Sequence, residues 1–138
     1  MSERSFTVIA GVIYSVNPVH RNSTRGKSQW TIDENAEISC FQGVHNKNWI
    51  VGKKGWGLHL VNGKVTYLGL CNKHDKKVFV AKFVMSNAGV IVWHGYPADH
   101  RNNAHDIPDL QIINQWISSQ LIPLPKIRKI IKGQPCSL

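Results

Sequence analysis

The clearest structural signal in the chain is the stretch Leu58-His59-Leu60-Val61-Asn62-Gly63-Lys64-Val65-Thr66-Tyr67. An Asn-Gly pair between two runs of alternating apolar residues is typical of a two-residue type I′ hairpin turn. In that register Val61 pairs with Lys64, Leu60 with Val65, and His59 with Thr66. The stretch therefore predicts an antiparallel hairpin with one apolar face and one largely polar face.

Apolar segments on both sides of this hairpin predict the rest of a sheet. Upstream, residues 6–14 are β-branched and apolar and predict a first strand, and residues 38–42 and 49–51 predict two short strands. Downstream, residues 77–85 are apolar on both alternating sets except for Lys82, as in a central strand. A turn at 86–89 then returns the chain along 90–93 as a second hairpin. We expect an antiparallel sheet of about five or six strands.

The last third of the chain predicts two helices. Asp106 is expected to cap the first, over residues 106–121. Its inward stripe recurs at helical spacing: Leu110, Ile113, Trp116, Ile117 and Leu121. The second is expected over residues 125–132, ending near Gly133, with Ile127, Ile130 and Ile131 facing inward. Strands followed by helices predict one α+β domain over residues 1–138: a strand-rich part (5–93), a histidine-rich loop (94–106) and a helical tail (107–133).

The charge of the chain favours an anionic partner. Its 138 residues include 17 Lys and Arg against 8 Asp and Glu, a formal net charge of +9. Between residues 38 and 98 there are eight lysines and one acid, Asp75. A balance of this kind favours RNA or another polyanion, and an acidic protein is the alternative partner.

The segment 94–106 is the candidate catalytic site. It follows an apolar strand and holds three of the seven histidines: His94, His100 and His105. Histidine can act as general base or general acid near neutral pH, and Arg101 can stabilise a charged phosphate. Such a set would be sufficient for metal-free RNA cleavage, in which the 2′-hydroxyl is the nucleophile.

A metal site is the alternative interpretation of the same histidines, with Asp99 or Asp106 as a further ligand. Pro97 prevents a continuous helix through His94 and His100, so their spacing matches no helical metal motif. We therefore expect no metal and no other cofactor.

A second set of residues predicts nucleic-acid contacts. Trp49 and Trp56 flank the pair Lys53-Lys54, and exposed indoles can stack on bases while lysines contact phosphates. Burial of both indoles in the core is the competing interpretation. The polar face of the first hairpin adds His59 and Lys64, and the polar segment 17–37 adds Arg21 and Arg25.

Cysteine usage and hydropathy bear on the compartment. The three cysteines form no C-x-x-C pair, which suits a reducing cytosol. The apolar run at 6–14 is too short to span a bilayer. A cytoplasmic location without membrane contact is expected, and the oligomeric state is left open.

These features lead to one leading hypothesis and two alternatives. The leading hypothesis is a small basic protein that interacts with RNA, with metal-independent endoribonuclease chemistry by histidine acid and base as its catalytic form. The alternatives are a non-enzymatic binder of nucleic acid or nucleotide, and a phage- or plasmid-type inhibitor that acts through a protein interface.

Overall fold

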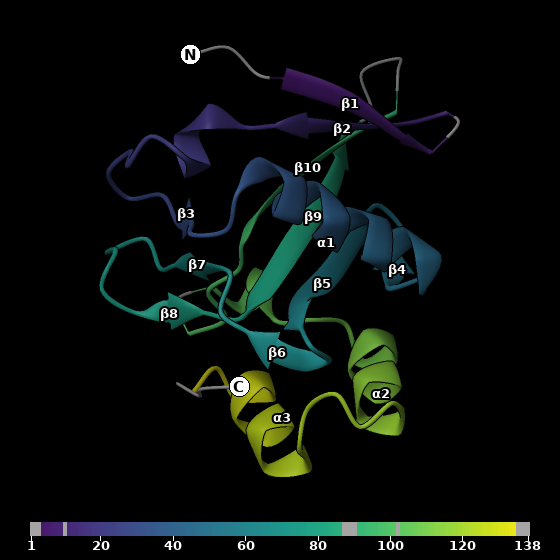
Figure 1. Cartoon of the computed structure of the whole chain (residues 1–138). Coiled ribbons are helices and arrows are strands. Elements are labelled where there is room, and N and C mark those ends of the chain that lie inside the picture. Colours follow the sequence, from purple (N-terminus) through teal and green to yellow (C-terminus); the bar gives the residue numbers. More distant parts are fainter. Residues whose placement is uncertain (1–3, 10, 87–90, 102, 135–138) are drawn as a thin grey trace.

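A mixed β-sheet with a helix packed across one face forms the centre of the fold (Figure 1). The computed structural model describes residues 4–9, 11–86, 91–101 and 103–134. Within these residues the main sheet has the strand order β1-β2-β10-β9-β5-β4, with β6 paired to β5. These strands are β1 (Arg4–Ile9), β2 (Val12–Val16), β4 (Ile50–Val51), β5 (Lys54–Val61), β6 (Lys64–Thr66), β9 (Val80–Ser86) and β10 (Val92–Pro97).

A smaller sheet and three α-helices complete the α+β architecture. The smaller sheet pairs β7 (Gly69–Leu70) with β3 (Gln29–Trp30) and β8 (Lys77–Val78). Helix α1 (Glu34–Asn46) lies in front of β9 and β5 in Figure 1, and α2 (Leu110–Ser118) and α3 (Leu124–Ile131) lie at the bottom of that view. None of the helices in the described part of the chain is long and apolar enough to span a membrane.

The Asn62-Gly63 hairpin is confirmed with the predicted register. Val61 pairs with Lys64, Leu60 with Val65 and His59 with Thr66. Both turn residues have positive φ, 52° at Asn62 and 77° at Gly63, as a type I′ turn requires. The second hairpin is also confirmed in its pairing, because β10 runs antiparallel to the central strand β9. Its predicted turn at 86–89 lies largely outside the described residues.

Four strand predictions need correction. Residues 77–85 are not one strand, because Lys77–Val78 forms β8 in the smaller sheet and β9 begins at Val80. Residues 6–14 are not one strand but belong to β1 and β2, which form an antiparallel hairpin. The sheet is mixed rather than purely antiparallel, because β10 runs parallel to β2. Residues 38–42 form no strand and belong to α1.

Helix α1 was missed because its start signal lies inside a polar segment. The Asp33 side chain accepts a hydrogen bond from the Ala36 backbone N–H, which caps the helix. The buried residues of the helix then recur at helical spacing: Glu37, Cys40, Phe41 and Val44. A buried glutamate among them breaks the apolar pattern that would otherwise have indicated a helix.

The two C-terminal helices are present with a shifted start and narrower apolar faces. Asp109, rather than Asp106, caps α2 by accepting a hydrogen bond from the Gln111 N–H. Asp106 instead ends the short 3-10 helix η2 (Ala104–Asp106). Leu110 and Ile131, both expected to face inward, are 62% and 42% exposed.

The packing of α1 on the sheet can be tested with two glycines. A Cβ at Gly57 on β5 would lie 2.7 Å from Val44 Cγ2 and 3.2 Å from Phe83 Cε2, whereas one at Gly43 on α1 meets no atom within 4 Å. Gly57→Ala is therefore expected to lower the free energy of unfolding by about 1–3 kcal/mol through overpacking. Gly43→Ala is expected to raise it by roughly 0.5–1 kcal/mol, because alanine favours the helix. Urea unfolding of both variants checks the pair, and equal effects would contradict this packing.

Candidate functional site

The face of the sheet opposite α1 carries a row of functional side chains. Tyr96 on β10 pairs with Lys82 on β9, and Lys82 pairs with Trp56 on β5. Neighbouring residues across paired strands point to the same face. Gly55, the residue before Trp56 on β5, faces the other side of the sheet and lies against Val44 of α1. The row Tyr96–Lys82–Trp56 therefore lies on the side of the sheet away from that helix.

Asp106 packs onto this row and holds it together. Its carboxylate accepts hydrogen bonds from the Tyr96 hydroxyl (2.8 Å) and the Asp99 backbone N–H (3.1 Å), and it lies 3.8 Å from Lys82 Nζ. Its backbone carbonyl accepts a hydrogen bond from Trp56 Nε1 at 3.1 Å. Lys82 Nζ also donates to the neighbouring His105 carbonyl at 2.5 Å. One buried aspartate thus fixes η2 against three strands.

Burial dominates the titration of these groups. It raises the pKa of Asp106, against the opposing effects of the Tyr96 hydrogen bond and the Lys82 charge. Burial lowers the pKa of Lys82, although Asp106 opposes this change. The pKa of Tyr96 is raised well above its ordinary value by burial and by Asp106. Tyr96 therefore stays protonated and keeps donating to the carboxylate at neutral pH.

His20, which ends the 3-10 helix η1 (Pro18–His20), lies against Tyr96. The two rings are stacked, with centroids 5.4 Å apart and planes 18° apart. His20 Nδ1 lies 2.9 Å from the Ser28 carbonyl oxygen. Because a carbonyl oxygen only accepts, Nδ1 carries the proton in the neutral ring, and Nε2 keeps a free lone pair. Burial lowers the pKa of His20, so the ring is neutral at pH 7.

A buried glutamate anchors the segment that carries His20. Glu37 of α1 is fully buried and accepts two hydrogen bonds from Arg21, from Nε at 3.0 Å and from Nη2 at 2.7 Å. The Tyr14 hydroxyl of β2 donates to the same carboxylate. The Gln29 side-chain amide further ties this segment by donating to the Val19 carbonyl at 2.8 Å. His20 is therefore held from both sides.

An open cavity of about 410 Å³ lies beside His20, which we call the His20 cavity. Its lining includes His20, Lys27, Tyr96, Asn103 and Asp106. Volumes of about 300–1,000 Å³ are typical of small-ligand sites. The arrangement combines a neutral histidine base, a nearby lysine and a rigid aromatic support.

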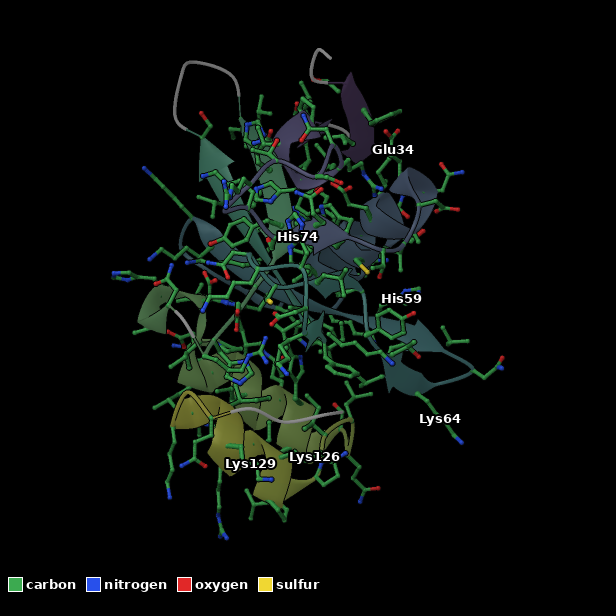
Figure 2. The ribbon with its side chains drawn as sticks, turned by 90° about the vertical axis from the view of Figure 1, so that its left-hand side faces the viewer. Glu34, His59, Lys64, His74, Lys126 and Lys129 are labelled. Atoms are coloured by element: carbon green, nitrogen blue, oxygen red, sulfur yellow. The ribbon has the colours of Figure 1, made fainter. Side chains whose placement is uncertain are left out.

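The loop after β7 lies beside this cavity. Asn72 lines the cavity, and His74 Nε2 donates to the Lys27 carbonyl at 2.9 Å. Figure 2 shows His74 in the middle of this side of the molecule. The same loop carries Lys73 and Lys76, both exposed.

The predicted catalytic residues do not share one site in the described contacts. His94 lies within β10 rather than in a loop, and its buried Nδ1 has no hydrogen-bond partner. His100 Nε2 lies 2.8 Å from the Gln134 carbonyl, after α3. The exposed His105 lines a different cavity, beside Lys53 and Lys54. No hydrogen bond or ring contact between described residues joins the three histidines.

Arg101 is paired with a carboxylate, so its guanidinium is not free to bind a phosphate. Its Nε donates to Asp99 Oδ1 at 2.9 Å, which offsets the charge of the guanidinium. Arg101 and His100 line a cleft of about 10 Å³ beside Ile130, with room for about one water molecule. This cleft is too small for a nucleotide.

The nucleic-acid contacts predicted for the two tryptophans and for Arg21 do not agree with the structure. Trp49 and Trp56 are each 4% exposed, so neither indole offers a face on which a base could stack. Trp49 instead packs edge-on against Trp116, with ring centroids 5.7 Å apart. Arg21 is committed to Glu37.

The other predicted contacts are available but dispersed. Arg25, Lys53, Lys54 and Lys64 are exposed. Lys64 lies at the tip of the β5–β6 hairpin, well away from His74 (Figure 2). His59 lines a third cavity, beside α1.

The sequence did not indicate His20 or Tyr96 as site residues, and it indicated Asp106 only as an alternative metal ligand and as a helix cap. His20 and Asp106 are separated by 86 positions (106 − 20), and no local motif links them. Tyr96 and Asp106 lie inside the segment 94–106, whose histidines were the predicted catalytic residues. Within the described residues, no group of three or more His, Cys, Asp or Glu side chains is arranged to hold a metal ion.

The state of His20 can be checked by NMR. Its pKa is expected below the ordinary value of about 6.5, with the proton of the neutral ring on Nδ1. Long-range ¹H–¹⁵N spectra report both, and the His20→Gln variant assigns the signal. A proton on Nε2 at neutral pH would contradict the hydrogen bond to Ser28.

The same pKa shift has a consequence for stability. Because the folded-state pKa is lowered, neutral His20 stabilises the fold above about pH 6.5, and this contribution is lost as the pH falls through the folded value. His45, whose pKa burial also lowers, contributes with the same sign. The loss of unfolding free energy on acidification should therefore be smaller in His20→Gln than in the wild type.

Comparison of the chain with protein-family models, with curated proteins and with solved structures found no match. Inference about function therefore starts from the chemistry of the His20 cavity and the charges around it.

Proposed function

We propose that the protein binds single-stranded RNA, with a phosphate of the backbone seated in the His20 cavity. The observation that carries this proposal is the cavity itself, in a strongly basic chain. Lys27 lines it and supplies the positive charge for a phosphate, and the free Nε2 of neutral His20 can accept a hydrogen bond from a ribose 2′-hydroxyl. The two carboxylates that also line it, Asp99 and Asp106, are paired with Arg101 and Lys82. Phosphate oxygens accept hydrogen bonds from the lysine ammonium group, and the opposite charges strengthen these bonds. Arg25, Lys73 and Lys76 are exposed in the two loops that carry Lys27 and Asn72, and in this proposal they add positive charge for a longer backbone.

An inhibitor that binds an acidic protein has less support in the structure. Such a protein would present a contiguous apolar patch. In the described residues, the exposed large apolar side chains lie on the β5–β6 hairpin, just before β10, on α2 and on α3: Val61, Tyr67, Ile91, Leu110, Leu124 and Ile131. They come from four separate parts of the chain, whereas Lys27 and the cavity that it lines occur together.

A second candidate function is metal-independent cleavage of the bound RNA, and one observation favours it. The hydrogen bond from Nδ1 to the Ser28 carbonyl leaves His20 Nε2 as a general base. In this step Nε2 takes the proton of a 2′-hydroxyl, and the 2′-oxygen forms a bond to phosphorus. The bond from phosphorus to the 5′-oxygen breaks, and that oxygen takes a proton from water. The His20 imidazolium then returns its proton to the hydroxide left by the water. The product is a 2′,3′-cyclic phosphate.

Binding can be tested with a labelled hexanucleotide of RNA titrated over a range of salt concentrations. The logarithm of the affinity should fall linearly with the logarithm of salt concentration, and Lys27→Ala should reduce the slope by about 0.7 for one lost phosphate contact. Lys129→Ala is the matched control, because it removes the same charge from α3, no residue of which is among those that line the cavity. Lys129 lies at the bottom of Figure 2, below His74. Equal effects of the two variants would indicate unspecific attraction, and no binding at low salt would overturn the proposal.

Cleavage is tested separately, in EDTA. If His20 is the base, His20→Asn should lower the rate by about 100-fold or more with little change in affinity. The rate should rise with pH through the lowered pKa of His20 and then level off. A loss of similar size in His94→Ala instead would favour the expectation from sequence. Intact binding without cleavage of any RNA would identify a binder rather than an enzyme.

A further inference from the structure

A second cavity lies on the other side of the η2 segment from the His20 cavity. It has a volume of about 530 Å³ and is lined by Lys53, Lys54, Trp56, His105 and Asp109, among others. Both lysines are exposed and follow the short strand β4. We call it the lysine cavity.

The two cavities are separated by a single turn of backbone. Asn103 and Asp106 line the His20 cavity, whereas Ala104 and His105 line the lysine cavity. The Asn103 side chain accepts a hydrogen bond from the His105 N–H at 3.0 Å, which closes the turn. The residues of η2 therefore form a common wall, with one cavity on each side.

This wall is held rigidly against the sheet. Lys82 Nζ donates to the His105 carbonyl, and Trp56 Nε1 donates to the Asp106 carbonyl. The Asp106 carboxylate accepts from Tyr96 on the opposite side. Contacts on both sides fix the spacing of the two cavities, so a ligand that reaches both meets a preformed surface.

The charges of the lysine cavity favour an anion. Lys53 and Lys54 contribute two positive charges near its walls, and Asp109 contributes one negative charge. The Asp109 carboxylate already accepts a hydrogen bond from the Gln111 N–H as the cap of α2, so its charge is partly offset by the helix N-terminus. Trp56 also lines this cavity but is buried, which makes base stacking a minor contribution here.

We infer that the natural ligand is an oligonucleotide strand whose backbone crosses the η2 wall, with one phosphate in the His20 cavity and another at Lys53 and Lys54. This inference rests on the proposed function and specifies its substrate class. A mononucleotide occupies one cavity only, whereas a strand gains from both because the second contact forms within one complex. Length dependence is therefore the signature that separates the two ligand classes.

The test compares RNA dinucleotides with hexanucleotides on the full chain. The hexanucleotide should bind more than 10-fold tighter. Lys53→Ala/Lys54→Ala should remove most of this advantage, reduce the salt slope for the hexanucleotide by about 1.4 for two phosphate contacts, and leave dinucleotide affinity within 2-fold. Lys27→Ala should weaken binding of both ligands.

The matched control is Lys126→Ala/Lys129→Ala on α3, which removes the same charge from a helix that also carries Arg128 and Lys132. If charge alone governs binding, this variant will weaken hexanucleotide binding as much as the Lys53/Lys54 variant does. That result would overturn the inference that the RNA backbone crosses the η2 wall. Equal affinity for both RNA lengths would also overturn the inference, although the proposed function would stand if Lys27→Ala still weakened the dinucleotide. Absence of any RNA binding would overturn both.

Discussion

The buried carboxylate of Asp106 is the constraint on which the site depends. It is 5% exposed, and it receives the Tyr96 hydroxyl and the Asp99 N–H while lying beside Lys82. A buried pair of this kind contributes little net stability, because removing two charges from water is costly. Loss of one partner would leave the other charge buried and uncompensated. The pair therefore specifies one position for η2 on the sheet, and this position creates a cavity on each side of it.

A second buried carboxylate, Glu37, has a similar role on the opposite face of the sheet. Through Arg21 and Tyr14 it connects the segment after β2, the strand itself and helix α1. Burial raises the pKa of Glu37, while the hydrogen bonds from Tyr14 and Arg21 oppose this. Because Arg21 directly follows His20, this anchor and the stacked Tyr96 hold the imidazole between two fixed supports. The His20 ring thus gains its position from both faces of the sheet.

The distribution of charge explains why the cavities matter more than the total of +9. Basic side chains also cover the outside of α3, where Lys126 and Lys129 lie apart from the cavity face (Figure 2). Charges on a solvated helix attract any polyanion and are screened by salt. In the RNA complex that we propose, those beside a cavity contact a phosphate at a defined place, next to a histidine of defined tautomer. Selectivity for a ligand arises from that combination, since attraction alone does not discriminate.

The sequence determined the features that depend on neighbouring residues. Asn62-Gly63 specified its turn because both residues tolerate positive φ, and the alternating apolar residues of β9 specified a buried central strand. The stripe of Ile113 and Trp116 and the Gly133 terminus likewise indicated the two C-terminal helices. Helix α1 was concealed because a buried glutamate, whose partners Arg21 and Tyr14 lie 16 and 23 positions away, reads locally as a solvated residue. The site was decided by tertiary structure alone: the stacking of His20 on Tyr96 joins residues 76 positions apart (96 − 20). Only the folded sheet brings such residues together, because no local pattern encodes which distant partner satisfies a buried polar group.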